Sequence, residues 1–173
     1  MSRWLGRRER VPLVDGDGLV LFVCHGNIMR SALAEAALRR ELGRDSQIRV
    51  ASAGTAAVPG KKADPRTITY ARAAGLDLDS HWATLLDRSL AEQAALLLAL
   101  DRRIEAEILA LGDGLSGRTV LLGGMTEDSD YPGRDIPDPY SLPPDEGNRS
   151  FDRVLESVAA LARRLGAKAA ARP

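Results

Sequence analysis

The feature that most restricts the fold is a continuous apolar run, residues 18–23, which directly follows an Asp-Gly turn. A run this short and uniformly apolar is typical of a β-strand that is buried on both faces. Such strands occur in parallel sheets whose two faces are covered by helices. The rest of the chain is therefore expected to alternate strands with helices.

That alternation can be followed along the chain. Residues 89–111 could form one long helix, but 95–100 is too uniformly apolar for a surface helix, and Asp101 is a suitable cap for a new one. Asp64 and Pro65 likewise open a helix, which ends at Gly75. We predict strands over 18–23, 48–51, 95–100 and 119–122, and helices over 31–42, 65–75, 102–111 and 148–165.

The expected fold is a single-domain α/β structure with a four-stranded parallel sheet and helices on both faces. A chain of 173 residues suits one such domain, which we place at residues 18–173. Residues 1–17 contain several arginines and end in the Asp-Gly turn, so they are expected to form an irregular extension. Residues 123–147 are rich in proline, glycine and aspartate and are expected to lack long elements.

The composition excludes several classes of function. Lysine plus arginine equals aspartate plus glutamate at 24 each, which argues against nucleic acid or an anionic membrane as the main partner. One cysteine and two histidines are too few for a disulfide framework or a cluster of metal ligands. We expect neither a metal nor an organic cofactor. The longest purely apolar run, residues 94–100, is far below the roughly 20 residues of a membrane span. We expect a cytoplasmic protein without membrane insertion.

The turn after the first strand contains the candidate chemistry. It reads Cys-His-Gly-Asn-Ile-Met-Arg-Ser over residues 24–31 and joins a buried strand to a helix. A tight loop of this kind turns backbone N–H groups inward, and together with the helix N-terminus it would bind a phosphate and favour a thiolate at Cys24. Gly26 and Asn27 tolerate the left-handed backbone that such a loop requires. Arg30 could bind two phosphate oxygens, and Ser31 could donate a hydrogen bond to the sulfur.

Other interpretations of these residues are less specific. A lone cysteine after an apolar strand is most often a small buried hydrophobe, and only the combination of Gly26, Asn27 and Ser31 with strand and helix favours a nucleophile. A cysteine phosphatase also needs an acid. The candidate is Asp138, which adjacent prolines hold in an extended loop, although Asp-Pro pairs commonly mark turns alone. Tyr140 could line the mouth of the pocket.

Taken together, these residues resemble the low-molecular-weight protein tyrosine phosphatase family over about residues 19–165. The matching segments are the loop 24–31, the acid segment 138–140, and residues 52–55 and 63–66 between them. The resemblance implies that Cys24 is the nucleophile, Arg30 holds the phosphate, and Asp138 is general acid and then general base. It further implies a phosphate-binding loop of His25, Gly26, Asn27, Ile28, Met29 and Arg30, a supporting network of Asn27, Ser31, Ser52 and His81, and a substrate pocket of His25, Ile28, Val58 and Tyr140.

The resemblance also implies a substrate class. Family members that act on phosphoarginine have threonine at the position of Ile28, whereas an isoleucine keeps the pocket apolar and favours phosphotyrosine in proteins. The aliphatic Val58, together with residues 60–65 and the run 135–140, resembles the bacterial branch that is paired with tyrosine autokinases in exopolysaccharide export. This resemblance suggests such a kinase as a partner. Met29 stands where many members have a second cysteine, so oxidised Cys24 would have no internal resolving thiol.

Two alternatives remain open at this point. The same loop and thiolate would accept arsenate, and with a single cysteine a low-molecular-weight thiol would have to complete an arsenate reductase cycle. The chain could also be a phosphotyrosine- or anion-binding module that has lost turnover, although Cys24, Arg30 and Asp138 together argue against it. The sequence does not indicate an oligomeric state.

Overall fold

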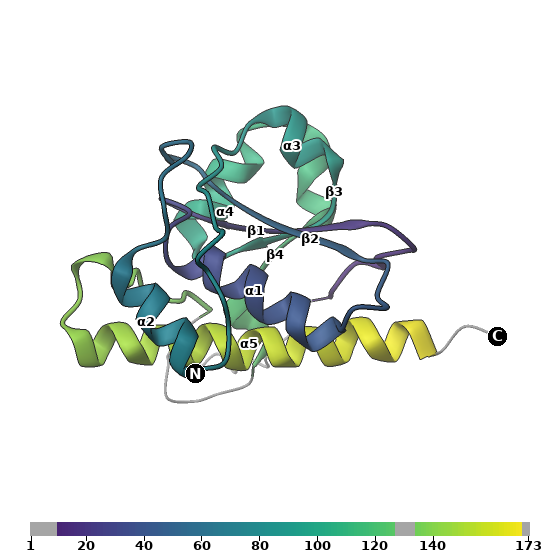
Figure 1. Cartoon of the computed structure of the whole chain (residues 1–173). Coiled ribbons are helices and arrows are strands. Elements are labelled where there is room, and N and C mark those ends of the chain that lie inside the picture. The colour runs from purple at the N-terminus through teal and green to yellow at the C-terminus, as the bar shows by residue number, and fades with distance from the viewer. Residues whose placement is uncertain (1–9, 127–133, 171–173) are drawn as a thin grey trace, which may run out of the picture.

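The computed structural model describes residues 10–126 and 134–170. Four strands, β1 (Leu19–Cys24), β2 (Arg49–Gly54), β3 (Ala94–Ala99) and β4 (Thr119–Leu121), form one parallel sheet in the order β2-β1-β3-β4 (Figure 1). The prediction of a four-stranded parallel sheet is confirmed. All six residues of β1 are buried, as the apolar run predicted.

Helices cover both faces of the sheet (Figure 1). On one face, α1 (Arg30–Leu42) and α5 (Pro144–Ala170) pack on Val20 and Phe22 of β1, and α2 (Pro65–Ala73) lies beside them. On the other face, α4 (Arg102–Leu109) packs on Leu21 and Val23, and α3 (Arg88–Gln93) flanks it. The side chains of β1 thus alternate between two apolar clusters, which is why the whole strand is apolar. Short 3₁₀ turns lie at Asp113–Arg118, Leu122–Met125 and Pro139–Ser141.

Several element boundaries differ from the prediction. The last helix begins at Pro144 rather than at residue 148, since proline suits the first helical position and Asp145 and Glu146 stabilise the first turn. Helix α3 was not predicted; its six residues begin after Asp87, whose carboxylate accepts a hydrogen bond from the backbone N–H of Leu90 at 2.7 Å. The fourth strand ends at Leu121, because Leu122 already belongs to a 3₁₀ turn.

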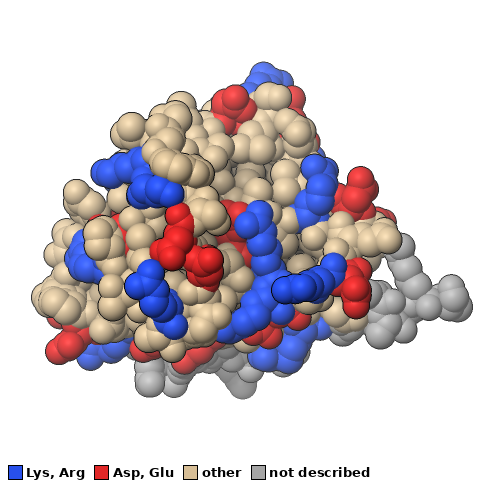
Figure 2. Space-filling model, viewed as in Figure 1, with Lys and Arg blue, Asp and Glu red and all other residues tan. Residues whose placement is uncertain are grey.

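The predicted N-terminal extension, residues 1–17, lies partly outside the described residues. Residues 10–18 form no helix or strand, and the side chain of Val11 is buried against the core of the α1 and α5 face. No helix within the described ranges is both long enough and apolar enough to cross a membrane. On the face shown in Figure 2, basic and acidic side chains are interspersed.

The sheet order brings three loops together at the carboxyl ends of the strands. Strand β1 lies between β2 and β3, and Cys24, its last residue, pairs with Gly54 of β2. On the other side, the backbone N–H of Leu100, just after β3, donates to the carbonyl of Val23. The turn after β1 is therefore flanked by the segments that follow β2 and β3, the arrangement in which open α/β sheets bind ligands.

Candidate active site

The loop between β1 and α1 runs from Cys24 to Arg30 and is bonded to the segment after β2. The carbonyls of Cys24 and His25 accept hydrogen bonds from the backbone N–H groups of Thr55 and Ala56 at 3.0 and 2.9 Å. Asn27 has a φ of 52°, so the loop does contain a left-handed residue. Gly26, the other residue that tolerates such a backbone, does not adopt it. One left-handed residue, and not two, is enough to turn this chain from strand to helix.

The sulfur of Cys24 lies among hydrogen-bonding groups rather than in hydrocarbon alone. Its Sγ is 2.9 Å from the hydroxyl oxygen of Ser31 and accepts the backbone N–H of Asn27 at 3.3 Å. The hydroxyl oxygen of Ser31 also accepts a bond from the side-chain amide of Asn27 at 2.9 Å. The hydroxyl hydrogen of Ser31 has two acceptors within reach, the sulfur at 2.9 Å and the carbonyl of Ala53 at 3.4 Å. Groups that donate to sulfur favour its anionic form.

Asn27 connects the loop to β2 and to the segment 81–84. Its Nδ2 donates to the hydroxyl of Ser52 at 2.8 Å, its Oδ1 accepts the backbone N–H of Thr84 at 2.8 Å, and its carbonyl oxygen is 2.7 Å from Nε2 of His81. The structure thus brings together Asn27, Ser31, Ser52 and His81, the four residues of the expected network. The sequence reasoning missed Glu35, whose carboxylate accepts the hydroxyl of Ser52.

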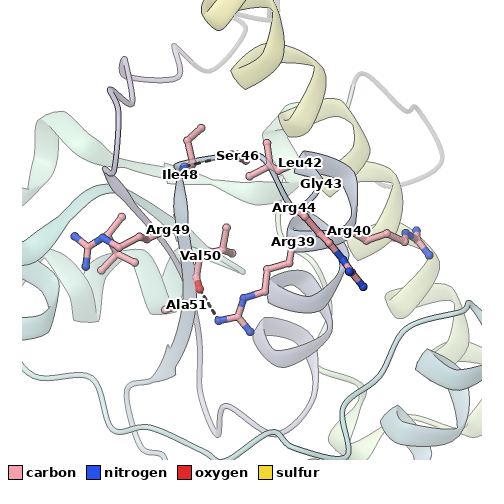
Figure 3. Close-up of a pocket in the computed structure, with 11 residues that line it drawn as sticks. Arg39, Arg40, Leu42, Gly43, Arg44, Ser46, Ile48, Arg49, Val50 and Ala51 are labelled. Atoms are coloured by element: carbon pink, nitrogen blue, oxygen red, sulfur yellow. Dashed lines mark hydrogen bonds between the residues drawn. The ribbon is translucent and has the colours of Figure 1, made fainter.

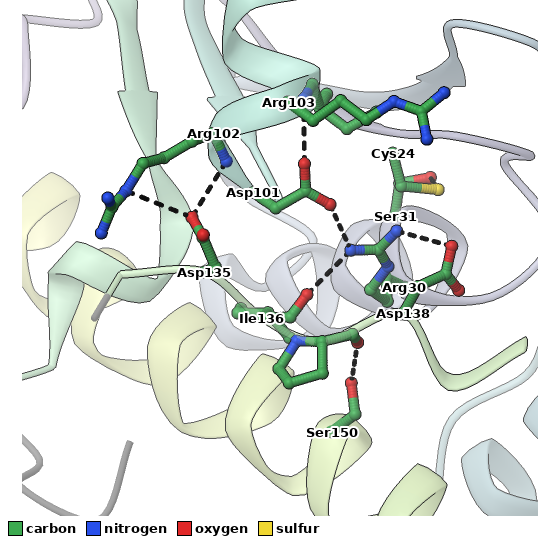
Figure 4. Close-up of polar contacts among 12 residues, drawn as sticks. Cys24, Arg30, Ser31, Asp101, Arg102, Arg103, Asp135, Ile136, Asp138 and Ser150 are labelled. Atoms are coloured by element: carbon green, nitrogen blue, oxygen red, sulfur yellow. Dashed lines mark hydrogen bonds and ion pairs between the residues drawn. The ribbon is translucent and has the colours of Figure 1, made fainter. Parts of the chain in front are cut away.

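The guanidinium of Arg30 is held from two directions (Figure 4). Its Nη1 donates to Asp101 Oδ2 and to the carbonyl of Ile136, both at 2.8 Å, and its Nη2 is 2.9 Å from Asp138 Oδ2. The side chain of Arg30 is only 2% exposed. A buried guanidinium needs such partners, because an unpaired buried charge is strongly destabilising. The sequence predicts Asp101 only as a helix cap, although its place just beyond the end of β3 puts it at the same sheet edge.

Asp138 reaches the site from a segment far along the chain. It lies just before the 3₁₀ turn Pro139–Ser141, has an extended backbone, and accepts the N–H of Tyr140 at 3.1 Å. Its side chain is 43% exposed, so the carboxyl group faces solvent as well as Arg30. The Asp138 side chain is therefore accessible to solvent in spite of its ion pair with Arg30.

A pocket of about 260 Å³ opens above the loop. Cys24, Arg30 and Asp138 all line it, so the three residues proposed for catalysis share one cavity. Val58 and Tyr140 are 63% and 62% exposed and form part of its rim. Lys61 also lines the pocket and was not expected; its position after a Pro-Gly turn was the only signal. The remaining lining residues are His25, Gly26, Ile28, Met29 and Ala56.

A larger cavity, about 850 Å³, lies at the opposite edge of the sheet (Figure 3). It is bordered by the first residues of β1 and β2 and by the end of α1, including Arg39, Arg40 and Arg44. It contains neither the cysteine nor any of the network residues. Arg39 bonds to the carbonyl of Val50 and pairs with Glu35, so this part of the cavity wall is already neutralised. The smaller pocket is the one with reactive groups.

Nothing in the described part of the chain indicates a metal site. Within residues 10–126 and 134–170, no group of three or more histidine, cysteine, aspartate or glutamate side chains is arranged to hold a metal ion.

Comparisons with known proteins agree with this geometry. Residues 19–171 match the family described as low molecular weight phosphotyrosine protein phosphatase. The Wzb phosphatase of Salmonella typhimurium is 33% identical over 86% of this chain and 95% of its own. The solved structure of Vibrio vulnificus Wzb in complex with benzylphosphonate is 30% identical, with a TM-score of 0.75 over 87% of this chain and all of that one. The YwlE arginine phosphatase from Geobacillus stearothermophilus is 25% identical, with a TM-score of 0.76 over 87% of this chain and 94% of that one. A match over most of the chain, with this loop and pocket, shows that the protein belongs to the low-molecular-weight protein tyrosine phosphatase family.

Proposed function

We propose that this phosphatase hydrolyses phosphotyrosine in proteins through a phosphocysteine intermediate at Cys24. The observation that carries the proposal is the shared cavity, in which the Cys24 sulfur, the Arg30 guanidinium and the Asp138 carboxyl line one pocket of about 260 Å³. A nucleophile, a cation for the phosphoryl oxygens and a proton donor are the three groups that this reaction requires. No metal or organic cofactor enters the proposed steps.

In the first step, the thiolate of Cys24 attacks phosphorus in line with the bond to the tyrosine oxygen. The phosphorus–oxygen bond breaks as the sulfur–phosphorus bond forms, and Asp138 gives its proton to the departing phenolic oxygen. Arg30 and the backbone N–H groups of the loop hold the phosphoryl oxygens, whose charge is spread in the transition state. The hydrogen bonds from Ser31 and from the backbone of Asn27 support the anionic nucleophile.

In the second step, water attacks the phosphocysteine. Asp138, now ionised, accepts a proton from that water, and the sulfur–phosphorus bond breaks to release phosphate and the thiolate. The solvent exposure of the Asp138 side chain supports both roles, since the carboxyl must meet a phenolic oxygen first and a water molecule afterwards.

The lining of the pocket supports an aromatic phosphate. Ile28 is buried in the wall of the pocket, and Val58 and Tyr140 add apolar and aromatic surface at its rim. A pocket wall of this kind favours the ring of a phosphotyrosine over the polar side chain of a phosphoarginine. We therefore favour phosphotyrosine although an arginine phosphatase has a similar fold.

The phosphoprotein substrate and the place of action can also be proposed. We propose a bacterial tyrosine autokinase of the exopolysaccharide pathway as the phosphoprotein substrate, and the cytoplasm as the place of action. The support is the aliphatic Val58 at the rim and the match to Wzb proteins over most of the chain.

Two variants test the mechanism. Cys24→Ser should abolish hydrolysis of an aryl phosphate, because a serine hydroxyl is a far weaker nucleophile than a thiolate. The folded variant should still bind inorganic phosphate, which isothermal titration calorimetry would measure. Asp138→Asn should lower the rate for phosphotyrosine by roughly 10²–10⁴-fold, the usual contribution of a general acid. Near-normal rates in either variant would refute the mechanism.

The substrate class needs its own assay. The purified protein should hydrolyse a phosphotyrosine peptide much faster than matched phosphoserine and phosphoarginine peptides. The same measurements on Ile28→Thr should show a smaller preference for phosphotyrosine over phosphoarginine. Equal or greater turnover of phosphoarginine by the unmodified protein would contradict the proposed substrate.

A further inference from the structure

Asp135 lies three residues before the proposed general acid and contacts a different element. Its Oδ1 accepts the backbone N–H of Arg102, the first residue of α4, at 2.9 Å (Figure 4). The same oxygen is 3.6 Å from Nε of Arg102. Both side chains are largely exposed, at 48% for Asp135 and 64% for Arg102, so the longer ion pair contributes little. The hydrogen bond to the backbone is therefore the main contact that Asp135 itself makes with α4.

The residues that follow Asp135 contact Arg30, which lines the catalytic pocket. The backbone N–H of Ile136 donates to the carbonyl of Leu100 at 2.9 Å. The carbonyl of Ile136 accepts Nη1 of Arg30 at 2.8 Å. Two residues further along the chain, Asp138 meets the other nitrogen of the same guanidinium. The segment 135–138 therefore lies along Arg30, and Asp135 fixes the end where it begins.

Two aspartates, Asp101 and Asp135, accept backbone N–H groups at the N-terminus of α4. Asp101 accepts the N–H of Ile104 with one oxygen and binds Arg30 with the other. Asp135 accepts the N–H of Arg102, a second amide group that has no partner inside the helix. A carboxylate at this position also interacts favourably with the positive end of the helix dipole. The same helix end therefore positions the arginine through Asp101 and the acid segment through Asp135.

We propose that Asp135 is a positioning residue for the general acid: its bond to the Arg102 backbone keeps Asp138 at the distance from the pocket that proton transfer requires. This inference rests on the proposed function. Asp135 does not line the catalytic pocket, and it acts only through the segment that carries Asp138. Its loss should therefore impair protonation of the leaving group rather than substrate binding.

Leaving groups of different basicity separate these two effects. A phenolate as basic as that of tyrosine depends strongly on the proton from Asp138, whereas a nitrophenolate leaves well without it. The value of kcat/KM reports the steps up to cleavage of the phosphorus–oxygen bond, the step in which the proton is given. The ratio of kcat/KM for nitrophenyl phosphate to that for phenyl phosphate therefore measures how well the acid is positioned. That ratio is unaffected by a partly unfolded sample, because both substrates meet the same active fraction.

The experiment compares three variants with the unmodified protein. Asp135→Ala should raise the ratio about tenfold, a part of the roughly 10²–10⁴-fold that a general acid supplies. Arg102→Ala removes the longer ion pair but keeps the backbone N–H, so its ratio should stay within about twofold of the unmodified value. Asp135→Asn retains an oxygen that accepts the Arg102 N–H, so it should restore most of the loss.

The result that overturns the inference is an unchanged ratio in Asp135→Ala, whether both rates fall together or neither falls. An equal rise in Arg102→Ala would also overturn it, since the ion pair and not the backbone bond would then be responsible. Asp138→Asn serves as the reference. If it raises the ratio strongly while Asp135→Ala does not, the proposed function stands and only the role of Asp135 fails.

Discussion

At the scale of single residues, Asn27 combines backbone and side-chain roles that few residues could supply. Its positive φ suits asparagine better than most side chains, and its amide group both donates and accepts. Through these bonds it joins the end of β1 to β2 and to the segment around Thr84. The position of Cys24 thus depends on Asn27, whose side chain takes no part in the proposed chemical steps.

Asn27→Asp tests that dependence with almost no change in shape. The aspartate keeps the oxygen that accepts Thr84 N–H but replaces the amide that donates to Ser31 and Ser52, and it adds a negative charge near the thiolate. We expect kcat for an aryl phosphate to fall at least tenfold and the free energy of unfolding in urea to fall by about 1–3 kcal/mol. Asn148→Asp, an exposed change of the same kind in α5, is the control. Equal effects in the two variants would contradict the role given to Asn27.

At the scale of elements, the site depends on how closely the end of β2 approaches the loop after β1. A Cβ atom added to Gly54 would lie 2.5 Å from the carbonyl oxygen of His25 and 2.8 Å from the backbone nitrogen of Asn27. Both are backbone atoms of the loop, so they could make room only if the loop moved. Glycine at the end of β2 thus sets the position of the loop that contains the nucleophile.

Gly54→Ala should therefore displace the loop. We expect a loss of about 1–3 kcal/mol in the free energy of unfolding, together with a marked fall in kcat/KM for an aryl phosphate. Gly26→Ala is the matched control for stability, because its added Cβ would meet the side chain of Ile28 at an ordinary 3.6 Å and its φ is not positive. Urea unfolding midpoints compare the stabilities of the two variants. If Gly54→Ala lost less stability than Gly26→Ala, the loop would have room for the added Cβ, and the prediction would be wrong.

At the scale of the whole molecule, α2 is tied to α5 by Tyr70. Its ring packs on Phe151 with centroids 4.9 Å apart, and its hydroxyl donates to the carboxylate of Asp152. Burial, the bond to Asp152 and the nearby negative charges of Asp152 and Glu156 raise the pKa of Tyr70 well above its ordinary value. The folded protein therefore holds this proton more tightly than the unfolded chain does.

The raised pKa of Tyr70 predicts that the free energy of unfolding falls at alkaline pH. The contribution of Tyr70 is fully present below the ordinary tyrosine pKa of about 10 and is lost as the pH rises above it, because only the unfolded chain releases the proton there. Tyr70→Phe should be less stable than the unmodified protein at pH 7, since Asp152 loses its donor, and the difference should shrink between about pH 10 and pH 11. Urea midpoints at each pH measure it, and a difference that does not change with pH would contradict the assignment.

Much of the fold and part of the site could be predicted because their determinants are local. A short apolar run after a turn is typical of a strand buried on both faces, and the four strands and four of the five helices follow from patterns within a few residues. Cys24, Asn27, Arg30 and Ser31 lie within one turn, so their proximity is a property of the chain itself. The start of α5 and the short α3 were missed because helix ends depend on single caps, which compete with packing.

Local sequence patterns are enough to predict the strand, the loop and the helix that place a cysteine, an arginine and a serine around one point. Asp138 is already a candidate acid in the sequence, but the contacts of Arg30 with Asp101 and with the carbonyl of Ile136 follow only from the tertiary structure. Asp101 reaches Arg30 across 71 positions and the carbonyl of Ile136 across 106, so their contacts exist only when β3 packs beside β1. Secondary-structure preferences depend on residues a few positions apart. A buried guanidinium, in contrast, is paired with groups from any segment that the sheet brings to the same edge.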